Sequence, residues 1–309
     1  MRAIIPILVD AFRFTPGGAK RTFRLWMETE THVFAFAMAA NVLIAFFPFL
    51  LVIASLCKYV LHWPDAVQAI ERAVRDFFYG EAGNFLATSI DRAFLLSGHT
   101  RFEWRSLLLL MITANGVFVP LEVALNRAWG VARNRSIWMN QVVSTGLIFV
   151  CGALALLASI ISAAHTGLFN LLFGRWPGLV DVLTTGVLKL VSLPFSILTM
   201  FLVYWLLPFR KINPRYILPS AIRVGLALEI AKWLSIWITP WMLAKFYRET
   251  TIFQHSLTIL AWSYLASMIV LAGAQSSAWL ARTMEARELE AAKEIAIPTT
   301  VVSQPSPNG

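Results

Sequence analysis

Three charged side chains lie inside one apolar stretch of the sequence, where they could bind or transfer a proton or another ion. Arg223, Glu229 and Lys232 interrupt the run from 217 to 239. If this run is a membrane helix, each charge at its centre costs about 2.5–3.5 kcal/mol on insertion scales, whereas an aliphatic residue returns roughly 0.3–0.6 kcal/mol. Charges in such positions need partners, and they commonly mark ion or proton pathways.

Glu229 lies close to the middle of this run and needs a partner inside the protein. Lys232 is three residues further along, on the same helical face, and Lys189 in the preceding apolar run should lie at a similar depth. Arg223 lies near the end of the run, where its side chain can reach polar surroundings. We predict that Glu229 faces the bundle interior and pairs with Lys189 or Lys232. The pair is either a proton- or ion-coupled site or a structural link between two helices, and the sequence favours neither.

Further candidates are prolines and amides within apolar runs. Each interior proline removes one backbone donor and frees the carbonyl one turn earlier, so such a break can line a cavity, although proline is also ordinary in membrane helices. The candidate helix breaks are Pro48, Pro120 and Pro194. Asn115 and Gln275 are candidates for a substrate or ion pathway, and interhelical hydrogen bonding is the simpler role for both.

The apolar character of the chain predicts the elements that hold these residues. Of 309 residues, 58% are hydrophobic and 14% charged, against about 25% charged in an average soluble domain. A membrane span needs roughly 20 apolar residues, and backbone groups in hydrocarbon must pair within the protein. We therefore predict an all-α, polytopic membrane helix bundle within residues 33–281. Its expected spans, about six, are residues 33–57, 106–125, 141–164, 182–207, 217–239 and 256–280.

The distribution of Lys and Arg predicts the orientation, because cytoplasmic connections are rich in them. One side of the predicted bundle receives the N-terminal segment 1–32, which we expect at the interface, and two basic connections. Their positive residues are Arg2, Arg13, Lys20, Arg21, Arg24, Arg127, Arg133, Arg135, Arg210, Lys211 and Arg215. We expect both termini in the cytoplasm of a bacterium, with the bundle in the cytoplasmic (inner) membrane. Residues 282–309 are expected to form a charged helix and a disordered tail.

The connection between the first two spans is too long for a bare loop. Apolar residues recur at helical spacing in two stretches between Lys58 and Glu103: Val67, Ile70, Val74 and Phe77 or Phe78, then Phe85, Leu86, Ile90 and Phe94. We predict two amphipathic helices on or just outside the external face of the membrane. They form either a cap over the bundle or a gate for a substrate.

Patterns typical of metal, cofactor or catalytic chemistry do not emerge from the chain. The five histidines are scattered without zinc-ligand spacing, and Cys57 and Cys151 both fall in apolar runs. We recognise neither a phosphate-binding glycine loop nor a nucleophile elbow. The sequence therefore predicts a non-enzymatic protein without a cofactor or metal. Its partners are expected to be the lipid bilayer and, at the basic face, anionic lipids rather than nucleic acid, although the net charge is +9.

Several short strings together resemble the YihY/BrkB family (virulence factor BrkB) of bacterial inner-membrane proteins, formerly mislabelled as ribonuclease BN. The resemblance runs from about Phe34 to Leu280. The strings are Ala45-Phe46-Phe47-Pro48, Leu125-Asn126-Arg127-Ala128-Trp129-Gly130 with Arg133 and Trp138, Leu207-Pro208, Pro219-Ser220-Ala221, Glu229 with Lys232, Trp262-Ser263-Tyr264, and Gly273-Ala274-Gln275. The chain departs from the family at Asn41 and Ala45, where Tyr and Ser are usual, at Ser220 instead of Gly, and at Gln275 instead of Glu.

The resemblance implies a six-span inner-membrane fold with a transporter or exporter role. It does not supply a substrate, and no pattern in the sequence specifies a coupling ion or an oligomeric state. The alternative is a non-transporting membrane scaffold or envelope-integrity factor that binds lipids or a partner complex.

Overall fold

The computed structural model describes residues 24, 26–77, 81–96, 104–131, 135–173, 177–210, 212–245 and 251–296, and these residues contain helices but no strand. Six long helices lie at the six predicted span positions. They are α3 (Thr29–Ser55), α6 (Trp104–Ala128), α7 (Ile137–Phe173), α8 (Pro177–Leu206), α9 (Pro214–Lys245) and α10 (Thr251–Ala296). Two shorter helices, α4 (Pro64–Phe77) and α5 (Glu81–Leu96), fill the connection after α3. The prediction of an all-α membrane helix bundle is confirmed.

Helix boundaries follow local chemistry at several points. Pro64, Pro177 and Pro214 each begin a helix, where proline has no hydrogen bond to lose and its φ is already helical. α6 ends where Gly130 adopts φ 69°. The Gly130 N–H donates to the Arg127 carbonyl and the Val131 N–H to the Asn126 carbonyl, which closes the helix in a Schellman motif. α3 ends in one π-helical turn, Leu56–Val60.

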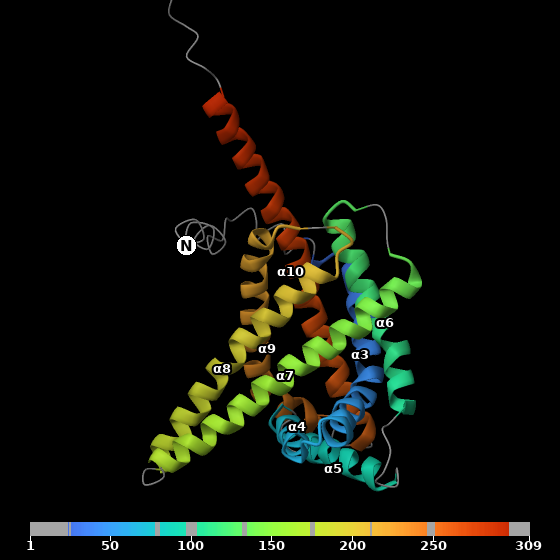
Figure 1. Cartoon of the computed structure of the whole chain (residues 1–309), viewed down its shortest axis with the longest axis vertical. Helices are drawn as coiled ribbons and strands as arrows, with labels where there is room; N and C mark the ends of the chain where they lie inside the picture. Colours follow the sequence, from blue (N-terminus) through green and yellow to red (C-terminus); the bar gives the residue numbers. More distant parts are fainter. Residues whose placement is uncertain are drawn as a thin grey trace, which may run out of the picture.

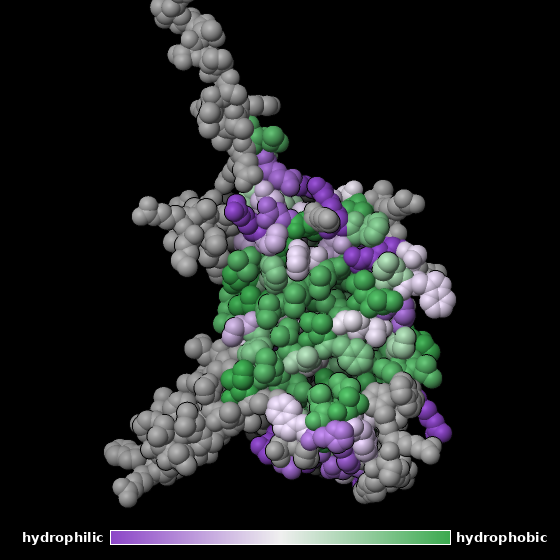
Figure 2. All heavy atoms as spheres, viewed as in Figure 1, coloured by the Kyte–Doolittle hydropathy of each residue, from purple (hydrophilic) through white to green (hydrophobic). Residues whose placement is uncertain are grey.

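An apolar band crosses the middle of the molecule. On the face drawn in Figure 2, hydrophobic side chains fill the centre and hydrophilic side chains gather at the two ends. Among the described residues, four helical segments are long and apolar enough to cross a membrane: Thr29–Val60, Leu107–Ala128, Trp138–Ala158 and Ser256–Ala286. The described apolar part of α8 is shorter, Ser192–Leu206, and α9 carries the three predicted intramembrane charges.

The bundle is organised around α10, which packs against α3, α6 and α9 (Figure 1). α8 packs between α7 and α9. At one end, which we call the basic face, arginines cap the ends of helices. Arg135 donates to the carbonyls of Leu206 and Leu207 at 2.9 and 2.8 Å, and Arg282 donates to the carbonyl of Ala128 at 2.6 Å. These bonds satisfy C-terminal carbonyls that have no partner within α8 and α6.

The opposite end, which we call the hairpin face, is covered by α4 and α5 (Figure 1). Ala66, Ile70, Val74, Leu86 and Ile90 are buried, and they share one apolar cluster with residues of α3 and with Ile259 of α10. The predicted amphipathic helices are thus present. They pack on the bundle and form a cap over this end, and a role as a gate for a substrate stays a prediction.

Two carboxyl groups meet between the helices of this cap. Glu71 of α4 and Asp91 of α5 are joined by a side-chain hydrogen bond. Burial raises the pKa of Glu71, and the hydrogen bond and negative charge of Asp91 raise it further, whereas the charges of Arg75 and Arg72 lower it. A proton on the Glu71 carboxyl group is therefore favoured by the folded hairpin.

A second close contact joins three membrane helices at Gly273 of α10. A Cβ atom built there would overlap Val224 of α9 and the hydroxyl group of Tyr204 on α8. That hydroxyl group donates to the Val270 carbonyl at 2.7 Å, which fixes the ring against α10. Any side chain at position 273 must therefore separate the three helices.

We expect Gly273→Ala to lower the free energy of unfolding by about 1–3 kcal/mol, the usual cost of overpacking. The matched control is Gly146→Ala in α7, where a Cβ atom meets nothing within 4 Å. That change should be neutral or should stabilise by about 0.5–1 kcal/mol, because alanine favours a helix over glycine. Thermal unfolding of the detergent-solubilised protein measures both. Equal effects of the two changes would contradict the packing at Gly273.

Stability should also depend on pH through Glu71. Because its pKa is raised on folding, its contribution is fully present below the unfolded-state value and is lost as pH rises through the folded-state value. We expect Glu71→Gln to resemble the native protein at acidic pH and to unfold at a higher temperature near neutral pH. Asp91→Asn should make the unfolding temperature depend less on pH than in the native protein, because Asp91 helps to raise the pKa of Glu71. A difference between native protein and Glu71→Gln that stays constant with pH would contradict this.

Candidate functional site

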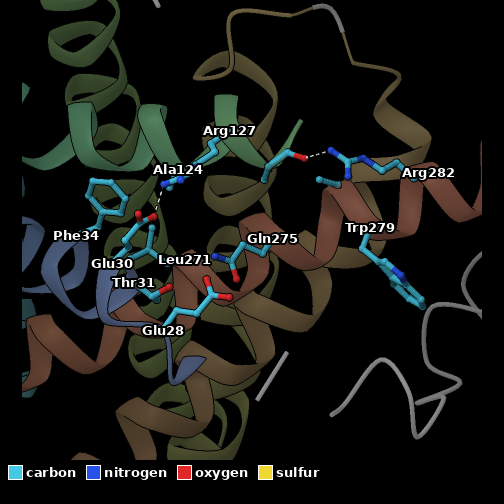
Figure 3. A pocket seen from close by; sticks show the side chains of 12 residues that line it. Glu28, Glu30, Thr31, Phe34, Ala124, Arg127, Leu271, Gln275, Trp279 and Arg282 are labelled. Atoms are coloured by element: carbon cyan, nitrogen blue, oxygen red, sulfur yellow. Dashed lines mark hydrogen bonds and ion pairs between the residues drawn. The ribbon is translucent and has the colours of Figure 1, made fainter. Parts of the chain in front are cut away.

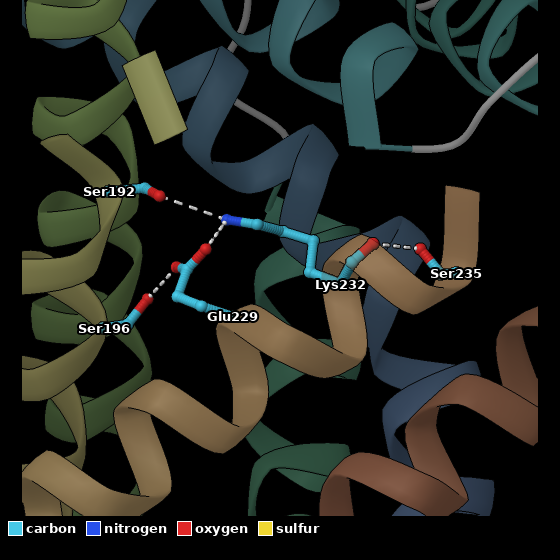
Figure 4. Close-up of polar contacts among 5 residues, drawn as sticks. All are labelled: Ser192, Ser196, Glu229, Lys232 and Ser235. Atoms are coloured by element: carbon cyan, nitrogen blue, oxygen red, sulfur yellow. Dashed lines mark hydrogen bonds and ion pairs between the residues drawn. The ribbon is translucent and has the colours of Figure 1, made fainter. Parts of the chain in front are cut away.

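Glu229 and Lys232 form an ion pair within the apolar part of α9. The Lys232 Nζ atom lies 2.6 Å from Glu229 Oε2, with 10% of the Glu229 side chain and 33% of the Lys232 side chain exposed. Oε2 is buried, and its contact with Lys232 is an ion pair rather than a well-aligned hydrogen bond. The i,i+3 spacing places both side chains on one face of the helix, which faces α8 (Figure 4).

Two serines of α8 complete this cluster. Ser196 donates from Oγ to Glu229 Oε1 at 2.6 Å, and Lys232 Nζ donates to Ser192 Oγ at 3.3 Å (Figure 4). The serines are four residues apart, so they lie one turn apart on the same face of α8. We call Glu229, Lys232, Ser192 and Ser196 the α8–α9 polar cluster.

The backbones of α8 and α9 approach closely beside this cluster. A Cβ atom on Gly225 would lie 2.7 Å from Ile197 Cγ1 and 3.1 Å from the Ile197 backbone. Glycine at this position allows the short serine side chains to reach Glu229 and Lys232. Pro194 lies between the two serines, where it removes a backbone donor from α8.

The structure pairs Glu229 with Lys232, one of its two predicted partners. The side chains of Lys189 and Asn115 lie outside the described part of the structure, although both residues are in helices. Arg223 is half-buried and donates to Ser220 Oγ at 3.0 Å, one turn toward the basic face. Chemically, the cluster holds one carboxylate between an ammonium group and a hydroxyl group, so adding a proton to Glu229 would remove the charge that holds Lys232.

A separate cavity of about 280 Å³ opens near the basic face (Figure 3). It lies between the start of α3, the end of α6 and α10. Its lining residues are Glu28, Glu30, Thr31, Phe34, Ala124, Arg127, Ala128, Leu271, Gln275, Ala278, Trp279 and Arg282. The cavity therefore includes the predicted candidate Gln275. The α8–α9 polar cluster and the prolines do not line it.

The three predicted helix breaks are not brought together into one site. Pro48 is buried in α3, Pro120 is half-buried in α6 and Pro194 is exposed on α8. α3 and α6 pack against each other, and the described residues give no indication that α8 joins them at Pro194. Whether these breaks have a role in a pathway remains a prediction.

Sequence reasoning missed a buried carboxylate, Glu122 of α6, which is 2% exposed. The Asn126 amide, one turn later, lies 3.5 Å from Glu122 Oε1 and accepts a bond from the Phe209 N–H at 2.9 Å. Asn126 thus ties α6 to the segment after α8. The sequence does contain a signal for this contact: Glu122 lies inside an apolar run, four residues before Asn126.

The part of the chain that the structure describes contains no group of three or more His, Cys, Asp or Glu residues that could hold a metal ion. His32 instead contacts the hydroxyl group of Tyr264 at 2.6 Å, which links α3 to α10.

Comparison with known proteins gives one family and several distant relatives. A profile of the family described as Virulence factor BrkB matches residues 22–297. Relatives named UPF0761 membrane protein include those of Chromohalobacter salexigens (24% identical, covering 80% of this chain and 58% of the relative) and Pseudoalteromonas atlantica (26% identical, covering 62% and 64%). One from Actinobacillus pleuropneumoniae is 22% identical over 82% of this chain and 90% of the relative. The chain thus spans less than two thirds of the first two relatives. No solved structure matches it.

The ion pair itself can be tested by breaking it. We expect Lys232→Met to destabilise the protein by about 2 kcal/mol, less than for a fully buried pair, because it leaves the Glu229 carboxylate without its cation. Lys245→Met at the exposed end of α9 is the control. The double change Glu229→Gln with Lys232→Met should recover most of the loss, as measured by thermal unfolding in detergent. A double variant that loses the sum of the two single effects would show that the residues are not coupled.

Proposed function

The chain belongs to the virulence factor BrkB family of membrane proteins, and from this membership and the geometry above we propose that it transports or exports a solute across a bacterial cytoplasmic membrane. The observation that carries the proposal is the α8–α9 polar cluster. A carboxylate and an ammonium group in hydrocarbon are costly, and apolar side chains of similar size could join two helices equally well.

The division of contacts within the cluster suggests how a proton would act on it. Glu229 Oε1 accepts from Ser196, whereas Oε2 faces Lys232. Protonation of the carboxylate would remove the attraction for Lys232 but allow the contact with Ser196 to persist. Lys232, already one-third exposed, would then be held by Ser192. The release of Lys232 from Glu229 within α9, with the two serine contacts to α8 kept, is the step that we propose is coupled to transport.

The remaining parts of the proposal concern location and chemistry. We propose that the basic face, with the exposed Arg127 and Arg282, lies in the cytoplasm together with both termini, and that it attracts anionic lipid head groups. No reaction is proposed, nor any cofactor or nucleic-acid partner. A reporter that fluoresces only in the cytoplasm, fused after residue 296, tests the orientation, and a dark fusion in intact cells would refute it.

A second candidate is a non-transporting scaffold or envelope-integrity factor that binds lipids or a partner complex. The observation that favours it is the separation of the two polar sites: the cavity near the basic face does not reach Glu229 or Lys232. An ion pair that lies outside this cavity would serve assembly rather than a solute pathway. Stoichiometric recovery of a partner, without solute movement in liposomes, would support this candidate.

The transport proposal predicts solute-dependent proton movement. The native protein is reconstituted in liposomes that contain a pH-sensitive dye, and amino acids, organic acids and sugars are added outside, with and without a pH gradient. At least one solute class should change the internal pH, and Glu229→Gln should reduce the change to that of empty liposomes because it removes the carboxylate that we propose takes up the proton. Glu285→Gln, an exposed carboxylate on α10, is the control. Undiminished movement with Glu229→Gln would refute the proposed role of this residue.

A further inference from the structure

The cavity near the basic face has two chemically different parts. Leu271, Ala124 and Ala278 of its lining are buried, and Phe34 and Trp279 add aromatic surface. The charged residues of the lining are exposed, so they form its rim: Glu28, Glu30, Arg127 and Arg282. A fully polar ligand would leave the apolar wall unused. The lining therefore matches an amphiphile.

The rim carries equal numbers of acidic and basic groups. Glu30 and Arg127 are joined by an ion pair across it, and both side chains are well exposed. Glu28 makes no ion pair with another described residue, and its side-chain end is turned toward that of Gln275 (Figure 3). Arg282 uses Nη2 to cap α6 and has further N–H donors on its guanidinium group. A carboxylate and a guanidinium group thus remain on one rim.

We propose that this cavity binds the head group of a zwitterionic phospholipid, with an ammonium group and a phosphate separated by a short linker. The ammonium group binds the Glu28 carboxylate and the Gln275 amide oxygen. The phosphate accepts hydrogen bonds from Arg282, for which guanidinium geometry is well suited. The glycerol group and the first methylene groups of the chains contact Phe34 and Leu271. The inference does not rest on the proposed transport activity.

The place of the cavity favours a lipid over a free solute of the same chemistry. Its lining joins Arg127 and Arg282 of the basic face to the buried apolar residues Leu271 and Ala278, as expected at the depth where lipid head groups lie. Trp279 in its lining is a residue type that prefers this interface. Glu28 distinguishes the site from a simple basic patch, because its carboxylate repels an anionic head group that lacks the ammonium group.

The test is a competition between two lipids with identical chains. The purified full-length protein is equilibrated in detergent with equal amounts of phosphatidylethanolamine and phosphatidylglycerol, and the bound lipids are counted by native mass spectrometry. The native protein should retain more phosphatidylethanolamine. Glu28→Gln should lower the ratio of the two bound lipids by about fivefold, the effect of one partly exposed charge pair. Glu285→Gln removes an exposed carboxylate further along α10 and should not change the ratio.

Two results would overturn the proposal. Equal retention of both lipids by the native protein would show general attraction to the basic face. If Glu28→Gln leaves the ratio of the two bound lipids unchanged, the Glu28 carboxylate does not bind the ammonium group. A third arm adds soluble phosphoethanolamine at the lipid concentration. It should displace little lipid, because it has no chains to contact Phe34 and Leu271, and full displacement would identify a solute site instead.

Discussion

Polar groups in the apolar band must find their partners within the protein, because hydrocarbon offers none. The arrangement of the helices depends on this constraint. Glu229 lies between Lys232 and Ser196, and this requires α8 to approach α9 closely enough for a serine side chain to reach across. Asn126 draws the segment after α8 onto α6 in the same way. At Gly273, the close approach of Val224 and Tyr204 joins α9 and α8 to α10, and the Tyr204 hydroxyl group donates to the Val270 carbonyl.

Backbone groups at the ends of the helices also need partners within the protein. The last carbonyls of α8 and α6 have no partners within their own helices, and Arg135 and Arg282 supply them. Some of the arginines that make one face basic therefore also hold that face together. This shared use places Arg282 both at the end of α6 and on the rim of the cavity, where it lies with Glu28 and Glu30.

Sequence reasoning located the elements of the site better than it located the site itself. It identified Glu229 and Lys232 because two opposite charges that are three residues apart in an apolar run have few other partners within reach. It also identified Gln275, but as one of several amides. Glu122 escaped notice because it is close to the end of its apolar run, where a carboxylate is unremarkable unless its burial is known. The serines of α8 carried no signal, since serine is common in membrane helices.

Hydropathy and the need for internal backbone pairing act locally along the chain, so the sequence was enough to predict a membrane environment, the helical class and the approximate positions of the long helices. The spacing of Glu229 and Lys232 was likewise enough to place them on one helical face. That this face meets Ser192 and Ser196, and that Glu28, Arg282 and Gln275 surround one cavity, emerges only when the helices are packed together. Those contacts join residues far apart in the chain, and they depend on how each helix is rotated and how closely it packs against its neighbours, which periodicity alone does not specify.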